Sequence, residues 1–336
     1  PGSFESSDWS FGAFGARNGC PKIAGFHQGR LWFGGIAGLP TTLIASCVGD
    51  FYNFRVDSDD DSALHLTLAS SDQRRICWIC PARKLLVGTT ESEWILSSPD
   101  GGAIRATTAT FNRQSSVGSE DKPADGVENT VFYVQRGGKR LREISYKLEA
   151  DGFTSTDMSL LAEHLFAPGI REWAVQRGGS TRLWVLMQDG SLAVLTMNME
   201  QQITAWQRME FPGRRVFHLA TIPKTGSHDD EVWFVMQNLQ SGHCSLERLS
   251  GDSFFLDGAC TGAPQPAPHL AGLLGFAYPE GRPEQAVPVQ FGADGSFDLP
   301  EAEPADSWTY GAVYDSELQT LPLERDFTFN TIRQEG

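Results

Sequence analysis

The residues of this chain that most directly suggest chemistry begin with an acidic run. Asp57, Asp59, Asp60 and Asp61 place four carboxylates within five positions, and carboxylate oxygens are the ligands that Ca²⁺ prefers. The run lacks the glycine and glutamate offsets of an EF-hand loop. We therefore expect a solvated acidic loop, with a calcium site as the alternative.

A second candidate is the pair Cys77 and Cys80, whose C-x-x-C spacing suggests zinc or redox chemistry. A structural zinc site needs two further ligands, and no second C-x-x-C occurs in the sequence. The pair lies within an apparent strand, where residues three apart face opposite sides. We expect neither chemistry, and we expect most of the six cysteines to be reduced core residues, as in a protein assembled in a cytoplasm.

A third candidate is the densest basic run of the chain, RGGKRLR, with Arg136, Lys139, Arg140 and Arg142. It could contact DNA or an acidic neighbour, and a solvated turn is the plainer interpretation. Three long polar loops, over 55–63, 116–127 and 224–230, are further contact candidates. The last of them includes Lys224, His228 and Asp229.

Motifs of known catalytic sites do not occur. The seven histidines form no H-E-x-x-H or other close metal pair, and the sequence has neither a G-x-S-x-G elbow nor a Walker loop. The nine tryptophans could line a glycan site, but their positions in apparent strands favour packing in a core. We expect no enzymatic function, no cofactor and no catalytic or metal-binding residue.

Composition narrows the class of protein further. The chain has 336 residues and a formal net charge of −15, which argues against tight binding of phosphates over the whole surface. The charge still allows DNA to pass nearby, because a negative wall would keep DNA from adhering. No stretch approaches the roughly 20 apolar residues of a membrane span.

The elements that must position these residues are short strands. In Thr181–Thr196, two alternating apolar runs flank Gln188–Ser191, and Asp-Gly between such runs is a strong hairpin signal. Similar strands recur every 40–55 residues or so, which is the period of propeller blades, at Arg30–Gly34, Lys84–Gly88, Thr130–Val134 and Glu231–Val235.

We therefore predict an all-β protein with a β-propeller-like domain of about five to six degenerate blades and a small C-terminal β domain. The expected organisation is an extended lead-in over 1–20, the propeller-like domain over 21–258, a linker over 259–268, the small β domain over 269–324 and a tail segment over 325–336. One helix is expected, over Asp157–Phe166, with Asp157 as its N-cap. The tetrapeptide QRGG occurs twice and predicts turns at equivalent places in two blades.

Taken in order, several segments resemble tail proteins of short-tailed bacteriophages and prophages. The family is that of the tail nozzle, or tail tubular protein B, and the packaged-DNA-stabilising tail proteins. The resemblance runs from about Trp9 to Glu324, and the segments that carry it are Ala24–Gly35, Ser46, Gly49–Phe54, Asp59–Leu64, Glu93–Trp94, Asn112–Ser115, Phe132–Gly138, Arg142–Glu143, Leu160–Phe166, Glu231–Trp233, Glu247–Leu249, His269–Gly272, Glu317 and Thr320–Glu324.

The resemblance implies a structural subunit of the virion tail, assembled in the bacterial host cytoplasm. Such subunits form a homo-oligomeric ring, typically a hexamer, below the portal and the tail adaptor. The ring extends the channel through which genomic DNA leaves, without sequence-specific binding, and helps to retain and eject the genome. Members of the family are often longer than this chain.

Two other classes of function remain open from the residues alone. A propeller that binds or cleaves host-surface glycans would need carboxylates and tryptophans converging in one pocket. A cellular propeller scaffold for protein partners would be a stable monomer. The state of assembly distinguishes both of these from the tail subunit.

Overall fold

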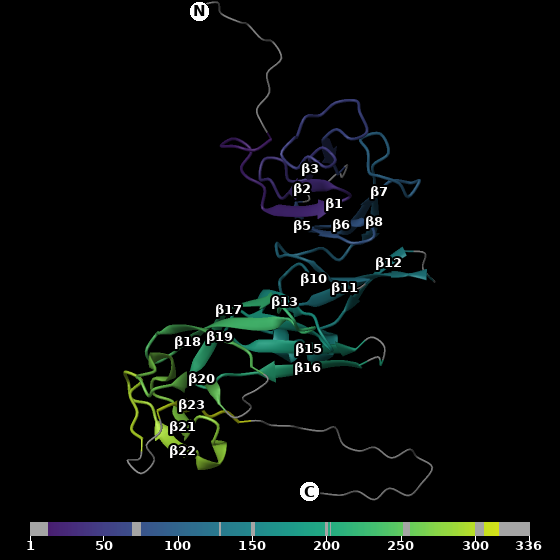
Figure 1. Ribbon diagram of the computed structural model, residues 1–336. Helices are drawn as coiled ribbons and strands as arrows, with labels where there is room; N and C mark the ends of the chain where they lie inside the picture. The colour runs from purple at the N-terminus through teal and green to yellow at the C-terminus, as the bar shows by residue number, and fades with distance from the viewer. Residues whose placement is uncertain are drawn as a thin grey trace, which may run out of the picture. The chain divides into compact units, whose positions relative to one another are not determined.

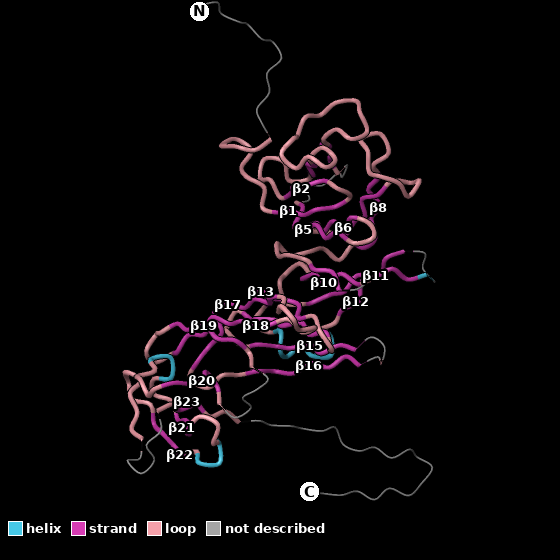
Figure 2. The backbone as a smooth tube through the Cα atoms, in the orientation of Figure 1, coloured by secondary structure: helices cyan, strands magenta, loops and turns pink. Residues whose placement is uncertain are grey.

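The computed structural model describes residues 13–68, 75–127, 129–148, 152–198, 201, 203–250, 256–299 and 306–315. Short strands dominate these residues, and helical turns are few (Figure 2). No helix among the described residues has the length and apolar character needed to cross a membrane. The chain divides into two compact units, the first comprising Pro1–Glu210, Val216–Met236 and Leu246–Leu249, and the second Phe211–Arg215, Gln237–Ser245 and Ser250–Gly336.

The strands form six antiparallel sheets, which we number I to VI in chain order (Figure 1). Sheet I contains β1 (Ile23–His27), β2 (Arg30–Gly34), β3 (Thr42–Ala45) and β4 (Leu64–Thr67). Sheet II contains β5 (Ile76–Pro81), β6 (Leu85–Thr89), β7 (Glu93–Ser97) and β8 (Thr110–Ser115). Sheet III contains β9 (Asp125–Val127), β10 (Thr130–Val134), β11 (Leu141–Lys147) and β12 (Gly152–Asp157).

The second half of the chain continues in the same way. Sheet IV contains β13 (Ile170–Gln176), β14 (Thr181–Met187), β15 (Leu192–Asn198) and β16 (Ile203–Met209). Sheet V contains β17 (Arg214–Ile222), β18 (Glu231–Asn238) and β19 (Cys244–Arg248), and its strands have residues in both units. Sheet VI contains β20 (Asp257–Gly262), β21 (Leu274–Pro279), β22 (Val287–Gln290) and β23 (Trp308–Ala312). The helical turns are η2 (Leu160–Ala162), α1 (Glu163–Phe166), η3 (Pro268–Leu270) and η4 (Pro283–Gln285).

The strands of sheets I to V follow one another as simple meanders, the arrangement of a propeller blade. Sheet VI differs, because its spatial order is β20-β23-β21-β22. The prediction of an all-β protein, with a β-propeller-like domain of about five to six degenerate blades and a small C-terminal β domain, is confirmed.

Central strands are covered on both faces by the neighbouring sheets. Along β10, Phe132 and Val134 belong to the core shared with sheet IV, whereas Val131 and Tyr133 belong to the core shared with sheet II. Successive side chains of a strand point to opposite faces, so both faces of sheet III are buried. This explains why the strands read as nearly continuous apolar runs.

We call the packed interface between two consecutive sheets a seam. Each seam of the first unit contains large apolar side chains. Trp32 of sheet I shares a core with Leu85 of sheet II, and the rings of Trp78 in sheet II and Tyr133 in sheet III lie 5.4 Å apart. The ring of Trp184 in sheet IV lies 5.6 Å from that of Phe234 in sheet V. The prediction that the tryptophans pack in the core agrees with these positions; Trp9 lies outside the described residues.

The hairpin expected at Thr181–Thr196 is formed by β14 and β15, with Leu186 opposite Leu192. At its turn, the Asp189 carboxylate accepts hydrogen bonds from the backbone N–H and the hydroxyl of Ser191, over 3.0 Å and 2.7 Å. Short polar side chains that bond to the backbone two residues on are what such turns require.

The expected helix over Asp157–Phe166 is wrong in its first half. Asp157 is the last residue of β12, and helical structure begins only at Leu160. The Asp157 carboxylate accepts from the N–H and hydroxyl of Ser159 over 2.9 Å and 2.7 Å, which closes a tight turn in place of capping a helix. Local side-chain bonds of this kind compete with helix formation.

The second unit has its own core around Leu270, Phe291 and Tyr310. An ion pair joins the buried Arg214 to the half-buried Asp257, with 2.8 Å between the nitrogen and the carboxylate oxygen. Strand β20 occupies Asp257–Gly262, so the first part of the range expected as a linker, 259–268, is a strand of sheet VI. Of the small β domain expected over 269–324, residues 300–305 and 316–324 lie outside the described residues, as does the tail segment expected over 325–336.

Replacement of Gly88 by alanine should destabilise the protein. A Cβ on Gly88 would lie closer than 3.0 Å to three atoms of the buried Trp78 indole, and overpacking of a core costs about 1–3 kcal/mol. We expect a lower urea midpoint with an unchanged slope. Gly126→Ala is the matched control, because its Cβ would meet Cys80 at an ordinary 3.8 Å; equal midpoints for the two variants would contradict this account of the seam.

Candidate functional site

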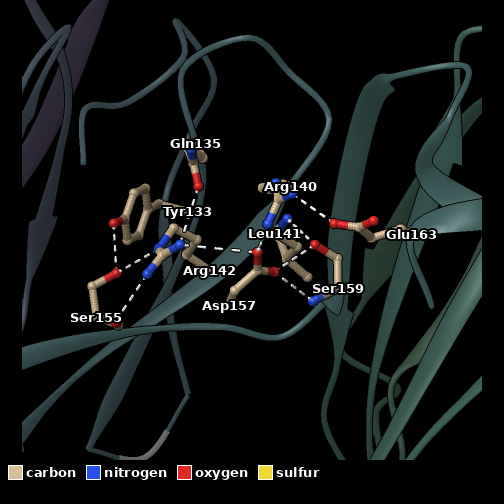
Figure 3. A network of polar contacts seen from close by, with 9 residues as sticks. All are labelled: Tyr133, Gln135, Arg140, Leu141, Arg142, Ser155, Asp157, Ser159 and Glu163. Atoms are coloured by element: carbon tan, nitrogen blue, oxygen red, sulfur yellow. Dashed lines mark hydrogen bonds and ion pairs between the residues drawn. The ribbon is translucent and has the colours of Figure 1, made fainter. Parts of the chain in front are cut away.

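A network of charged and polar groups covers one edge of sheet III, and it includes part of the basic run (Figure 3). Asp157 lies at its centre, where a carboxylate oxygen accepts from the Arg140 guanidinium over 2.6 Å. A second nitrogen of Arg140 bonds to Glu163 over 2.6 Å. Partial burial acts to raise the pKa of Asp157, but the hydrogen bonds from Ser159 and Arg140 and the charge of Arg140 together hold it below its usual range. The carboxylate therefore ties the end of β12 to the helical turn that follows.

Arg142 extends the network into the sheet. Its Nε donates to the Ser155 hydroxyl over 2.8 Å, and its other nitrogens donate to the Gln135 side chain over 3.1 Å and the Ser155 carbonyl over 3.0 Å. The Ser155 hydroxyl also lies 2.8 Å from the hydroxyl of Tyr133. Figure 3 shows these side chains converging across strands β10, β11 and β12. Arg142 therefore links β11 to β12 and to the end of β10 through side-chain hydrogen bonds.

Glu93 is a fully buried carboxylate at the seam between sheets II and III, with 0% of its surface exposed. The hydroxyls of Ser115 and Ser119 both donate to it, the latter over 2.8 Å. Burial raises the pKa of the Glu93 carboxyl, and the hydrogen bonds from Ser115, Ser119 and the Val117 backbone, with the charge of Arg142, partly oppose the rise. Glu93 thereby fixes the connection from β8 to β9.

Beside this network, η2 and α1 border a groove of about 740 Å³. We call it the leucine groove, and its lining residues are Asp157, Met158, Leu160, Leu161, Ala162, His164, Leu165, Thr204, Trp206 and Arg208. The Trp206 indole N–H donates to the Met158 carbonyl over 2.8 Å, which fixes one wall. Leu161 is 95% exposed and Leu160 57% exposed, so apolar surface is open to solvent at its rim.

The acidic run forms a folded cap over a buried arginine that the sequence analysis missed. Arg30 is only 2% exposed, and its guanidinium donates to the carbonyls of Ser46, Asp60, Asp61 and Ser62 over 2.6–3.3 Å. Two backbone oxygens of the run, those of Asp60 and Asp61, are therefore bonded to a cation of the protein. Arg30 is the first residue of β2, and no local pattern at this strand end signals that its side chain is buried.

Two carboxylates of the acidic run pair with arginines other than Arg30. Asp57 pairs with Arg55 over 2.6 Å, and Asp60 pairs with Arg105 over 3.3 Å. Hydrogen bonds from the Ser58 backbone and from Arg55 lower the pKa of Asp57. Among the described residues, no group of three or more histidine, cysteine or acidic side chains is arranged to hold a metal ion.

The remaining predicted contact residues lie in two exposed places. Arg136 and Lys139 are exposed at the turn between β10 and β11. Lys224 and His228 are exposed in the loop between β17 and β18. In that loop, the Asp229 carboxylate accepts from the Gly179 N–H over 2.8 Å. The structure thus brings Arg140 and Arg142 into one network. The acidic run and the loop between β17 and β18 do not belong to that network.

The two QRGG segments are both hairpin turns, but they occupy different positions in their sheets. The first joins the second and third strands of sheet III in chain order, and the second joins the first two strands of sheet IV. The expectation of equivalent places is therefore wrong. What they share is an acidic partner: Glu120 accepts from the Gly137 N–H over 3.0 Å, as Asp229 does from Gly179.

The Cys77 and Cys80 thiols are free and buried in the same core cluster. A register shift between Ile76 and Trp78 brings both cysteines to one face, so the reasoning that they face opposite sides is wrong. Burial raises the pKa of Cys77 to about 11 and that of Cys80 to about 12. Thiols this far from ionisation are poor nucleophiles and metal ligands.

Comparison with known proteins gives no family. No protein-family model matches the chain, and no curated protein matches it. The similar solved structures include the Myceliophteria thermophila Cps50 (Swd1) β-propeller domain, with 9% identity, a TM-score of 0.34 and coverage of 89% of this chain and 99% of that chain. At this level of likeness the match carries no argument about function.

Two further structures bear on one prediction. One is a luciferin-regenerating enzyme, with 12% identity, a TM-score of 0.28 and coverage of 67% of this chain and 88% of that chain. The other is the periplasmic gluconolactonase of Pseudomonas aeruginosa, with 13% identity, a TM-score of 0.33 and coverage of 89% and 90%. The prediction that the chain is not an enzyme is corrected by this finding, because proteins with enzymatic titles are among the similar structures.

Glu93 should make the stability of the protein depend on pH. A carboxyl whose pKa is raised on folding stabilises the folded state in acid and loses that contribution as the pH rises through the raised pKa. The free energy of unfolding should therefore show a decrease with rising pH that is absent in Glu93→Gln. Urea titrations across the acidic to neutral range measure it, with the exposed Glu284→Gln as control; parallel profiles for wild type and Glu93→Gln would contradict the assignment.

Loss of the Arg30 guanidinium should destabilise sheet I. Arg30→Met keeps an unbranched side chain but leaves the carbonyls of the buried Ser46 and Ser62 without the guanidinium donor, and each buried unpaired group costs about 1–3 kcal/mol. We expect a loss of at least about 2 kcal/mol in the free energy of unfolding, measured by urea denaturation. The exposed Arg83→Met should be neutral, and a neutral Arg30→Met would show that the cap does not depend on the guanidinium.

Proposed function

We propose that the chain is a structural subunit of a bacteriophage tail, which forms a ring below the portal and adaptor and extends the channel for the genome. The ring has six copies by the resemblance described above. Its partners are other copies of the chain, the tail adaptor and neighbouring tail proteins, and it resides in the virion after assembly in the host cytoplasm.

The observation that carries the proposal is that segments of the resemblance supply the side chains that fix irregular parts of the fold. Arg30 of the first segment bonds to Ser46 and to the acidic run. Glu93 of a later segment bonds to Ser115, and Arg142 bonds to Gln135. These segments therefore act together in one fold, in the order in which the resemblance gives them.

The charge of the chain supports the same proposal. A net charge of −15 would repel a polyanion rather than hold it. DNA could then move past such subunits without adhering to them.

The glycan-binding alternative receives less support from the groove. The leucine groove is lined by one tryptophan, Trp206, and one carboxylate, Asp157. The carboxylate is already paired with Arg140 over 2.6 Å. A glycan site of the kind considered above would bring several carboxylates and tryptophans together.

The state of assembly tests the proposed function. The purified chain is examined by light scattering and negative-stain imaging, alone and with the portal–adaptor complex of the phage or prophage that encodes it. We expect closed rings in at least one of the two conditions. An unrelated propeller of similar mass controls for non-specific capture, and a chain that remains monomeric with the complex present would overturn the proposal.

A further inference from the structure

One exposed apolar surface lies on sheet I, in the loop after β3. We call it the aromatic loop: Val48, Phe51, Tyr52 and Val56, which are 47%, 38%, 96% and 64% exposed. The Phe51 ring is steadied by that of Phe26, with 5.0 Å between the centroids. Several exposed apolar side chains gathered in one loop are typical of a site of interaction.

The aromatic loop is held rigidly by the backbone. The Val48 N–H donates to the Asp61 carbonyl over 2.9 Å, and the Gly49 N–H donates to the Gly29 carbonyl over 2.8 Å. Arg30 grips the other end of the same loop through the Asp60 and Asp61 carbonyls. A loop fixed in this way presents Tyr52 without a large entropic cost on binding.

The leucine groove is another exposed apolar surface of the first unit. It has an open hollow of about 740 Å³, which is large enough to take an aromatic side chain and its neighbours. Leu161 is 95% exposed at its rim. An aromatic anchor inserted in an apolar pocket is the usual centre of a protein interface.

The two surfaces differ in charge. The aromatic loop runs into the acidic run, where the exposed Asp59 and Asp61 add to Asp57 and Asp60, which are paired with arginines. The leucine groove carries Arg208, and the charge of its one carboxylate, Asp157, is paired with Arg140 over 2.6 Å.

Basic residues also lie next to the groove. Arg136 and Lys139 belong to the β10–β11 turn, which bonds to the chain after α1 through the Ile170 N–H and the Gly138 carbonyl over 2.6 Å. Glu163 and Glu210 offset part of this charge, through Arg140 and Arg208 respectively.

We propose that the aromatic loop of one copy of the chain seats in the leucine groove of the next copy, with Tyr52 as the anchor. Pairing of loop with loop would place carboxylates against carboxylates, and pairing of groove with groove would oppose basic residues, both of which are unfavourable. Contact between two different surfaces is heterologous, and repetition of a heterologous contact closes a ring when the rotation allows it. This inference rests on the proposed function, for which it supplies the contact between subunits.

The test uses two variants that each remove one surface. Tyr52→Ser removes the anchor and Leu161→Asp spoils the groove; both side chains are at least 95% exposed, so the fold should be unaffected, as circular dichroism and the urea midpoint will show. Under the conditions in which the wild type forms rings, we expect each variant alone to lose ring assembly. Mixed in equal amounts, they should form dimers with one copy of each and nothing larger, because only one intact loop and one intact groove remain to pair.

The control and the contrary outcomes separate this inference from the proposed function. Leu148→Asp, at an 82% exposed leucine elsewhere on the first unit, should form rings like the wild type. Rings from both variants would overturn the inference and leave the proposed function standing, as would two monomeric variants that fail to dimerise on mixing. A wild type that remains monomeric with the adaptor complex would overturn both.

Discussion

The fold of the first unit depends on burying both faces of small sheets. A sheet of three or four strands is marginal on its own, and each sheet here gains a core only by packing on the next one along the chain. The seam between sheets II and III shows the constraint most clearly. There the Trp78 indole occupies the space that a side chain on Gly88 would need, and the buried Glu93 carboxylate fixes the connection into sheet III through Ser119.

Buried polar groups in this protein serve the loops more than the strands. Strand ladders satisfy their own backbone groups, but a connection that crosses a seam leaves N–H and C=O groups to be paired. Arg30 pairs the carbonyls of the acidic run, and Asp157 pairs with the N–H of Ser159 and with Arg140. Each charged group is therefore placed where the chain leaves a sheet, and each turns an irregular segment into a fixed one.

The strands and the blade repeat could be predicted from the sequence, because both follow from its periodicity. The alternation through Leu183, Val185 and Met187, with Asp-Gly beyond it, predicted the β14–β15 hairpin. The burial of two charged side chains was not predicted, because nothing local distinguishes Arg30 or Glu93 from surface residues at a strand end. The helix was placed too early for a similar reason: Asp157 is a good N-cap by type, but cross-strand pairing with Arg142 keeps it in β12. The register shift in β5 that brings Cys77 and Cys80 to one face likewise depends on the pairing with β6, which spacing alone does not report.

The same constraint limits where a partner of the first unit can bind. Both faces of its inner sheets are buried in the seams. Exposed apolar surface is therefore found at strand ends, connecting loops and helical turns. Two exposed apolar residues lie on segments that the fold holds in place. Tyr52 lies on the loop bonded to Arg30, and Leu161 lies on the helical turn beside the Asp157 network. Exposed apolar side chains on loose loops would lose much of their binding energy to ordering. Because the interactions that hold these two segments are internal to the fold, their rigidity requires no partner, and a partner that binds them gains the apolar contact at little further cost.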